Sequence, residues 1–391
     1  MGTLFNRFHT WLLDNRKTLL SRFSTDEQEI QEPEKSLIEL PSSIGSKLIA
    51  AVNELPTDNP DMEAIQSTLD EAFEKWRSNP QVADNSVVIL SSPVTTVSRT
   101  LTESLLDWAS EREIPLRPLQ WIGRPEKAEN IKTKLQQQLG RGLVTTSKQS
   151  EVVVITNLSW CFLRCVDGLE GIDYLQDVLL QDDSRFWVIG AGKVGWEYLD
   201  HVSHFKAYCG EYLELPRLTG EQLQEWFEPI VSDFQINFAK PNIEFPNNEE
   251  DESDRSRYFE KLADLSEGVN TVAAQVFLSS IRYQTGNSDD SESDKTEGIL
   301  EAQNPELPNL PRLSADEHYI LYSLLLHGDL TLSALSESLG DEKTLVKGQV
   351  QRLRRKGLVE QKHEILTINP IHYPRLKSEL ANNNFIIYES D

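Results

Sequence analysis

Residues 86–106 read SVVILSSPVTTVSRTLTESLL, and this stretch sets the organisation of the whole chain. The apolar run at 87–90 predicts a buried strand and 97–111 has the pattern of a helix, so that a short turn joins the two. Such a turn cradles a phosphate when it carries Gly-x-x-x-x-Gly-Lys-Ser/Thr, because glycines let backbone N–H groups converge and lysine neutralises charge. The turn at 91–99 contains neither glycine nor lysine. The stretch therefore predicts the strand–turn–helix geometry without the phosphate chemistry.

The composition is that of a large and acidic globular protein. The chain has 391 residues with a net charge of −25, and 38% of the residues are hydrophobic. A chain of this length is expected to form roughly two or three domains. The charge argues against indiscriminate nucleic-acid binding, because a polyanion repels phosphate. The three cysteines form no CxxC pair and no segment is apolar enough to cross a membrane, so we expect a reduced, cytoplasmic protein without a metal site.

Beyond the opening stretch, strand and helix patterns alternate. The run EVVVIT at 151–156 is apolar on both faces, as in a strand buried within a parallel sheet. The alternation predicts an α/β fold with a parallel sheet flanked by helices. Further strands are expected at 116–121, 185–189 and 212–215, and helices at 43–54, 62–78, 125–139, 172–180 and 219–231.

The order of these elements resembles that of the P-loop ATPases of the AAA+ and STAND type. The segment YLELPRLTGEQL at 212–223 is similar to their LxLPxLTxEEL segment, and LSEGVNTVA at 265–273 is similar to the LSxGxxxxA turn of their helical lid. The resemblance covers residues 86–283. It implies a P-loop-like α/β sheet with a helical lid and a nucleotide site at the turn after the first strand.

The chemistry of that family is missing at two places. The resemblance implies a degenerate phosphate loop with Arg99 at the lysine position, and arginine does not replace lysine freely in a tight loop. Where the family has Asp-Glu after a later strand, this chain has Thr156 and Asn157, and neither side chain is a carboxylate base or a strong magnesium ligand. The residues at the degenerate loop are Ser92, Ser98, Arg99 and Thr100, with Thr100 at the position of the magnesium-binding hydroxyl.

These two losses predict a pseudo-ATPase, which keeps the fold as a platform and has no catalytic residues and no cofactor. Two alternatives stay open. One is an ordinary strand–helix turn that was never a phosphate loop. The other is an active ATP-dependent switch with an atypical loop, which would bind ATP and Mg²⁺.

A second glycine motif, GAGKVG at 190–195, follows the strand at 185–189. It formally matches the dinucleotide fingerprint GxGxxG, with Glu211 about 20 residues beyond. A dinucleotide fold needs further strand–helix units after this turn, and only one short strand follows. We therefore interpret the motif as a flexible loop, in which Lys193 is available to an anion or a partner.

Residues 1–23 have the pattern of a basic amphipathic helix. Such a helix lies in an anionic membrane surface, docks on a partner protein or packs back on its own domain. Under the first two alternatives the membrane or partner contacts are Phe5, Phe8, Trp11, Arg16 and Lys17, and the membrane alternative makes the protein a peripheral adaptor.

Composition shifts predict the domain boundaries. Residues 284–310 are polar and acidic and hold too few apolar residues to bury a core, so we expect a disordered linker there. The full expected order is a basic helix (1–23), a linker (24–42), an α/β domain (43–245), an acidic linker (246–257), a helical lid (258–283), the disordered linker (284–310) and a winged helix (311–391).

The winged helix is predicted from caps, turns and a sequence resemblance. Ser314 caps a helix, two more helices follow at 331–339 and 342–356, and Gly357 ends the last of them. The segment RLRRKGLVEQKHEILTINP at 352–370 resembles the end of bacterial winged-helix domains. In those domains the third helix enters the major groove and the wing touches phosphate.

Charge favours DNA contact by this domain. Residues 343–377 hold nine Lys and Arg against two Glu, in a chain that is strongly acidic overall. Cations near the C-terminal end of a helix are also favoured by the helix dipole alone. Many winged helices dock proteins, so the alternative is that this domain binds a protein partner. The expected DNA-binding residues are Lys347, Gln349, Arg352, Arg354, Arg355, Lys356 and Lys362.

The order of core, lid and winged helix is that of the origin-recognition ATPases of archaea and eukaryotes and of some STAND regulators. By this resemblance we expect a regulatory or scaffolding module that binds a partner protein and, through the winged helix, DNA.

Overall fold

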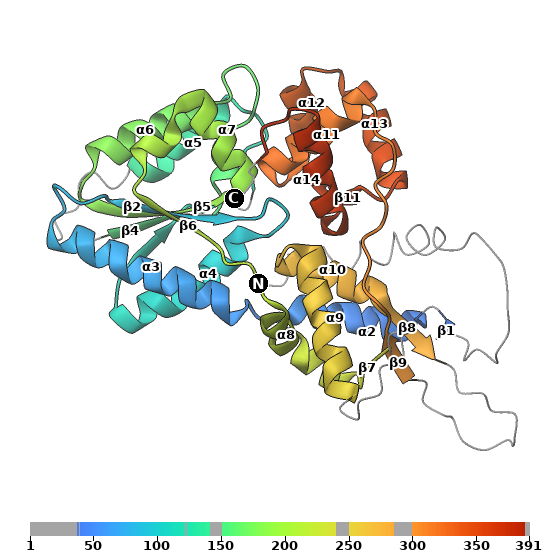
Figure 1. Cartoon of the computed structure of the whole chain (residues 1–391). Coiled ribbons are helices and arrows are strands. Elements are labelled where there is room, and N and C mark those ends of the chain that lie inside the picture. Colours follow the sequence, from blue (N-terminus) through green and yellow to red (C-terminus); the bar gives the residue numbers. More distant parts are fainter. Residues whose placement is uncertain are drawn as a thin grey trace, which may run out of the picture.

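A computed structural model describes residues 37–38, 40–121, 123–140, 151–239, 250–284 and 299–387 (Figure 1). The described chain forms an α/β domain, a helical lid with a small sheet, and a winged helix. These are the parts that the sequence predicts, and the predicted fold class is confirmed.

The α/β domain is built on one parallel sheet of five strands in the order β3-β4-β5-β2-β6. The strand that the opening stretch predicts, β2, lies between β5 and β6 and is buried along its whole length. A parallel strand covered on both faces must be apolar throughout, which explains the VVIL, VVVI and FWVI runs. The strands are β2 (Ser86–Ser91), β3 (Leu116–Pro118), β4 (Glu151–Ile155), β5 (Arg185–Gly192) and β6 (Glu211–Glu214).

Helices cover both faces of this sheet, as Figure 1 shows. On one face α3 (Asn59–Ser78) and α4 (Val97–Arg112) pack their apolar stripes on the sheet, with Trp108 and Phe186 in the centre of that layer. The opposite face carries α5 (Asn130–Leu139), α6 (Glu170–Gln181) and α7 (Lys193–Ser203), together with the 3-10 helices at Leu158–Cys161 and Phe205–Tyr208.

The prediction of a flexible loop at residues 190–195 is wrong. Strand β5 continues through Gly192, and α7 begins at the next residue, Lys193. Gly190 is required by close packing, because a Cβ there would lie 2.6 Å from the carbonyl oxygen of Thr156. The motif is therefore part of a direct strand-to-helix junction.

The lid is larger than the sequence indicates. Helix α8 (Gly220–Asp233) begins with a capping box between Thr219 and Gln222 and packs against α9 (Glu250–Ser266). Helices α2 (Ser42–Glu54) and α10 (Asn270–Ser280) complete the group, and Gly268 at φ +68° makes the predicted break between α9 and α10. In its core the rings of Phe227 and Phe277 stack at 4.4 Å between centroids.

Two predicted linkers contain regular structure. The described part of 246–257 belongs to α9, which begins at Glu250. Within 284–310, β9 (Ile299–Ala302) pairs with β8 (Ile281–Gln284), because Leu300 and Ala302 bury their side chains against the lid. The small sheet has the order β1-β8-β9-β7, with β1 at Leu37–Ile38 and β7 at Asn237–Phe238.

The winged helix follows the predicted order closely. Ser314 forms a capping box with Glu317 at the start of α11, and Gly357 after α13 has φ +77°. Its sheet is antiparallel in the order β10-β12-β11. The elements are α11 (Ala315–His327), β10 (Leu330–Thr331), α12 (Leu332–Leu339), α13 (Lys343–Arg355), β11 (Val359–Lys362), β12 (Ile365–Ile368), a 3-10 helix (Pro370–His372) and α14 (Tyr373–Asn382).

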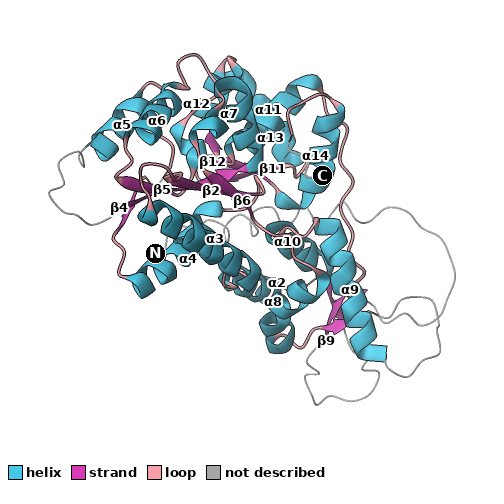
Figure 2. Cartoon of the chain, turned by 60° about the vertical axis from the view of Figure 1, so that its left-hand side comes forward, coloured by secondary structure: helices cyan, strands magenta, loops and turns pink. Residues whose placement is uncertain are grey.

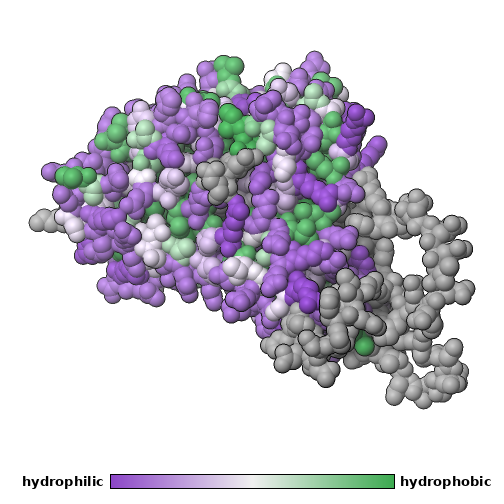
Figure 3. All heavy atoms as spheres, viewed as in Figure 1, coloured by the Kyte–Doolittle hydropathy of each residue, from purple (hydrophilic) through white to green (hydrophobic). Residues whose placement is uncertain are grey.

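The winged helix packs on the α/β domain through α11, which lies against α7 (Figures 1 and 2). One continuous apolar cluster includes one face of the central sheet, the lid and the inside of the winged helix. The three parts therefore share a core. On the face seen in Figure 3, hydrophilic side chains predominate and apolar ones form small separate groups.

Candidate functional site

Three backbone N–H groups of the turn between β2 and α4 bind carbonyls of the same turn. The N–H of Thr95 donates to the Ser92 carbonyl at 2.9 Å, and the N–H of Val97 donates to the Thr95 carbonyl at 3.0 Å. The N–H of Arg99 likewise donates to the Thr96 carbonyl at 3.0 Å. A phosphate cradle needs several N–H groups that converge on an external anion. In this turn the N–H groups of Thr95, Val97 and Arg99 are used internally, which agrees with the absence of glycine in it.

Arg99 does not occupy the place of a phosphate-binding lysine. Its Nη2 donates to the Leu55 carbonyl at 2.9 Å and its Nη1 to the Asn53 carbonyl at 3.4 Å, at the C-terminal end of α2. Its Nε donates to Glu103 at 2.9 Å. The side chain thus binds the orphan carbonyls that end a helix. Thr100, the expected magnesium ligand, is buried within α4, and Ser98 lies in the first turn of that helix.

The position of the acidic motif carries a helix cap. Asn157 Oδ1 accepts from the backbone N–H of Ser159 at 3.0 Å and from its hydroxyl at 2.7 Å, which starts the 3-10 helix after β4. Thr156 packs its carbonyl against Gly190 on the neighbouring strand. Both residues are used by local structure, and neither provides a carboxylate.

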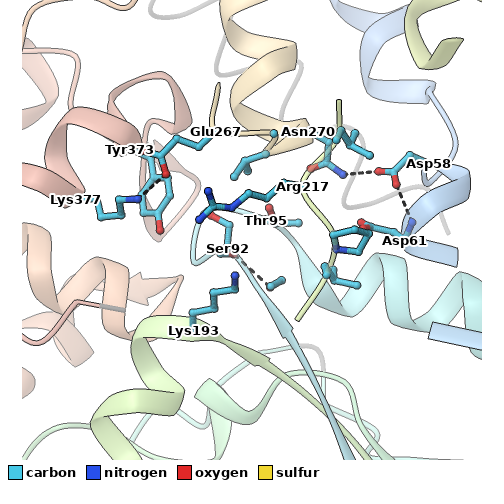
Figure 4. Close-up of a pocket in the computed structure, with 16 residues that line it drawn as sticks. Asp58, Asp61, Ser92, Thr95, Lys193, Arg217, Glu267, Asn270, Tyr373 and Lys377 are labelled. Carbon is cyan, nitrogen blue, oxygen red and sulfur yellow. Dashed lines mark hydrogen bonds and ion pairs between the residues drawn. The ribbon is translucent and has the colours of Figure 1, made fainter. Parts of the chain in front are cut away.

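A small slot lies where the carboxyl ends of β2 and β6 meet the lid and the winged helix (Figure 4). Its volume is about 60 Å³, whereas pockets for drug-sized ligands measure roughly 300–1,000 Å³. The slot is therefore too small for a nucleotide. Among its lining residues are Ser92, Thr95, Arg217, Tyr373 and Lys377.

Side chains of the winged helix close one side of this slot. Tyr373 begins α14 and is buried beside Ser92, and Lys377, one turn later, forms an ion pair with Glu267 of the lid. On the other side Lys193 pairs with Glu214 at 2.9 Å. Figure 4 shows Arg217 reaching into the space between these groups. The chain thus fills the region with its own charges.

A pair of aspartates lines the slot at the start of α3. Asp58 caps that helix by accepting from the N–H of Asp61 at 3.0 Å, and it also accepts from the amide of Asn270 in the lid at 2.9 Å. Burial, reinforced by the nearby charge of Asp58, raises the pKa of Asp61 to about 8. The Asp61 carboxyl is therefore predominantly protonated at neutral pH, which disfavours its use as a metal ligand.

A half-buried arginine joins the winged helix to the core. Arg124 donates to the carbonyls of Ser159 at 2.6 Å and Phe162 at 3.1 Å in the α/β domain, and to the carbonyl of Asp329 in the winged helix at 2.8 Å. Trp160 Nε1 donates to the Asp329 carboxylate at 3.1 Å. The two domains are therefore joined by polar contacts as well as by the shared core.

A second polar contact lies beside it. Arg164 donates its backbone N–H to His327 Nε2 at 3.3 Å, and its guanidinium donates to the carbonyl of Ser338 at 3.3 Å. His327 is fully buried. Burial, with the charges of Arg124 and Arg164, keeps the pKa of His327 well below its usual value. The imidazole is therefore neutral in the folded protein.

The last glycine of the GxGxxG motif belongs to the same interface. A Cβ on Gly195 would lie 2.7 Å from the carbonyl oxygen of Leu326 in α11. The glycine therefore lets α7 and α11 approach closely. The motif has a packing role, and Lys193 within it is bound to Glu214.

The winged helix presents α13 on its outer side, away from the α/β domain (Figure 1). Three of the seven expected DNA-binding residues, Lys347, Arg352 and Arg355, are exposed on it. Thr344 and Gln351 are exposed on the same helix. The surface formed by Thr344, Lys347, Gly348, Gln351, Arg352 and Arg355 is named here the α13 face, since positions i, i+3, i+4, i+7, i+8 and i+11 lie on one side of a helix.

The other four expected residues are less exposed, and three of them make contacts within the winged helix. Gln349 is buried and donates to Asp316 at 3.1 Å, so it is not available to read a base. Lys356 forms an ion pair with Glu317 at 2.7 Å, and Arg354 donates to Gln361 at 2.9 Å. Lys362 in the wing is half-buried, and its burial, opposed by the charge of Glu360, lowers its pKa to about 8.

The residues that sequence reasoning missed join segments far apart in the chain: Arg124, Trp160, His327, Tyr373 and Lys377. Arg124 and Asp329 are separated by 205 positions. Each is a single residue in an unremarkable local pattern, and no sequence signal marks it. The expected contacts Phe5, Phe8, Trp11, Arg16 and Lys17 lie outside the described residues.

In the described part of the chain, no helix is long and apolar enough to cross a membrane. Within the same ranges, no three His, Cys, Asp or Glu residues are grouped as a metal site requires.

Comparisons with known proteins gave structural neighbours only. No family model matches the chain, and no curated protein matches it in sequence. The chain is similar to Cdc6p from Pyrobaculum aerophilum, at 12% identity and a TM-score of 0.38 over 89% of this chain and 99% of that one. It is also similar to the ORC1 protein of Aeropyrum pernix in complex with DNA, at 14% identity and a TM-score of 0.34 over 85% and 95% of the two chains.

A third neighbour is the Holliday junction branch migration motor RuvB of Thermotoga maritima, at 17% identity and a TM-score of 0.31 over 81% of this chain and 94% of that one. Scores of this size assign no residue of the chain a role. The strand order and the packing give the architecture by themselves: a parallel five-stranded α/β core, a helical lid and a winged helix.

Proposed function

We propose that the chain is a pseudo-ATPase that works as a regulatory or scaffolding module, with a partner protein on its α/β platform and DNA on its winged helix. The observation that supports the first part most directly is the slot of about 60 Å³ at the place where a nucleotide would lie. Tyr373 and Lys377 of the winged helix line that slot.

Three requirements of phosphoryl transfer fail independently. Convergent N–H donors, a cation at the β- and γ-phosphates and a carboxylate for magnesium are the parts on which the chemistry depends. Here three N–H groups of the turn bind its own carbonyls, Arg99 binds the end of α2, and Asn157 caps a 3-10 helix. One loss could be compensated by a neighbouring group. Three losses, each tied to a structural contact, favour a role without hydrolysis.

The exposed α13 face supports the DNA part of the proposal. The winged helix docks on the core through α11, the turn at Asp329, α12 and α14, which leaves α13 on the outer side. Lys347, Arg352 and Arg355 then project from one face with two polar residues between them. Such a face is suited to phosphates on either side of a major groove. The rigid core would fix its orientation.

The first experiment tests the loss of nucleotide binding. Calorimetric titration with ATP and Mg²⁺ is expected to give no binding heat at millimolar nucleotide, and the thermal midpoint is expected not to move, since a ligand at 100 times its Kd would add about 2.7 kcal/mol. Saturable binding, or ATP turnover that disappears in Lys193→Ala or Thr95→Ala, would favour the ATP-dependent switch and overturn the proposal.

The second experiment tests DNA binding. The triple variant Lys347/Arg352/Arg355→Ala is expected to weaken duplex retardation and to reduce the slope of log K against log salt by about 1 for each phosphate that the variant no longer neutralises. The matched control removes three exposed cations elsewhere, Arg77/Lys127/Lys134→Ala, and should bind as the wild type does. Absence of retardation for the wild type at low salt would remove the DNA part.

A further inference from the structure

Gly348 lies in the middle of the α13 face, and no contact within the protein requires a glycine there. Gly348 is the sixth of 13 residues in α13, and no atom lies within 4 Å of the place where a Cβ would stand. Its φ is not in the left-handed region. Glycine disfavours a helix relative to alanine because it loses more backbone freedom on folding. The folded chain alone therefore gives no physical ground for glycine here.

The other helix-interior glycines of the described chain differ from it. Cβ atoms on Gly171 and Gly195 would meet backbone carbonyls at 2.3 and 2.7 Å, so those positions require glycine. Gly45 in α2 has an ordinary contact at 3.8 Å with the Leu40 side chain. Among the helix-interior glycines that the structure describes, Gly348 alone faces open space. The space over Gly348 is free for something outside the molecule.

The neighbours of Gly348 indicate what comes close. Thr344 and Gln351 lie one turn to either side along the α13 face and offer hydroxyl and amide groups, while Lys347, Arg352 and Arg355 surround them with positive charge. No acidic residue lies on this face between positions 344 and 355. Asp341 and Glu342 precede the helix, so the favourable field covers its middle and its C-terminal half. Base edges flanked by phosphates match this pattern of polar centre and cationic rim.

We propose that Gly348 is the point of closest approach between α13 and base edges in the major groove of duplex DNA. The inference rests on the DNA part of the proposed function and deepens it. Without a side chain at 348, the helix backbone lies deep enough for Thr344 and Gln351 to reach base edges, while the three cations contact phosphate. A methyl group at 348 lifts the helix from the groove floor. Gly348 thus acts as a positioning residue for sequence reading.

The test measures both stability and DNA affinity, because the inference predicts that Gly348→Ala raises the first and lowers the second. Duplexes are selected from a random pool with the wild-type chain, and affinities are measured for an enriched duplex and for a scrambled one. Gly348→Ala is expected to raise the thermal midpoint, because alanine favours the helix. It is also expected to weaken the affinity for the enriched duplex roughly tenfold, a change that corresponds to one base-pair mismatch, and to keep the affinity of the wild type for the scrambled duplex.

Gly45→Ala in α2 is the matched control, since it removes a helix glycine far from α13. It should stabilise the protein and leave both affinities unchanged. Equal binding of the enriched duplex by wild type and Gly348→Ala would overturn the inference and leave DNA binding itself standing. A pool that yields no enriched sequence would also overturn it, because the α13 face would then not read bases. Failure of the wild type to bind any duplex would overturn both this inference and the DNA part of the proposed function.

Discussion

At the scale of single residues, His327 shows how the interface between core and winged helix depends on protonation. Its Nε2 accepts from the backbone of Arg164, so the ring proton is on Nδ1, which has no hydrogen-bond partner among the described residues. A second proton would place a buried cation beside two arginines. The same contact that orients the ring thus excludes its charged form.

We predict that His327 makes the protein less stable in acid. Its pKa is depressed in the folded state and near 6.5 in the unfolded chain, so below that pH the unfolded state binds a proton that the folded state rejects. This contribution lowers the free energy of unfolding by about 1.4 kcal/mol for each pH unit below 6.5. Urea denaturation at pH 7.5 and 5.5 measures it as the difference between wild type and His327→Leu.

The control for this measurement is His363→Leu, since His363 is exposed at the tip of the wing. Its pH dependence should equal that of the wild type. Asp61 and Glu360 act in the opposite direction, because burial raises their pKa values to about 8, but they contribute equally to all three proteins. A His327→Leu protein with an unchanged slope would show that the imidazole takes up a proton as readily in the folded state as in the unfolded chain.

At the scale of elements, the close approach of α7 and α11 depends on Gly195. We predict that Gly195→Ala destabilises the protein by about 1–3 kcal/mol, because the new methyl meets the rigid Leu326 carbonyl at 2.7 Å and the backbone must shift. Helix propensity alone favours alanine. Gly45→Ala, without such a contact, should have the opposite sign in the same denaturation experiment. Equal stabilisation by both substitutions would mean that the two helices have room between them.

The same helices show what the sequence can predict. Capping residues, turn glycines and apolar periods are local signals, so the sequence indicates the caps at Thr219 and Ser314, the breaks at Gly268 and Gly357 and the strand at 87–90. The role of Gly195 has no local signal. It depends on a partner helix that lies more than a hundred residues away, and the motif GxGxxG has the same letters in either role.

The sequence predicts which chemical groups are missing from the candidate site, but it does not predict the geometry of the site. The absence of glycines, lysine and carboxylates can be seen in the sequence at 92–100 and at 156–157. The direction of Arg99 cannot be seen there, because it depends on where the C-terminal end of α2 docks. The closing of the slot by Tyr373 depends on the docking of a domain that begins more than two hundred residues after β2.

At the scale of the whole molecule, the α/β domain, the lid and the winged helix share one core. The linkers expected from the sequence would instead have joined them as separate, hinged domains. Apolar residues of the central sheet, the lid and the winged helix belong to one cluster, and Lys377 joins α14 to the lid. A nucleotide-driven switch needs domains whose relative position changes with the ligand. Domains that share a core and fill the slot between them are suited to a fixed scaffold.

We therefore predict that core and winged helix unfold together, and that Arg124 is the main polar tie between them. Calorimetry of the wild type should give one transition with equal calorimetric and van't Hoff enthalpies. Arg124→Met should lower the free energy of unfolding by about 1–3 kcal/mol, because the carbonyls of Ser159, Phe162 and Asp329 lose a charged donor. Arg77→Met, at an exposed ion pair, should change it by less than about 0.5 kcal/mol. Two separate transitions in the wild type would show that the winged helix moves independently, and a fixed scaffold would then no longer describe this molecule.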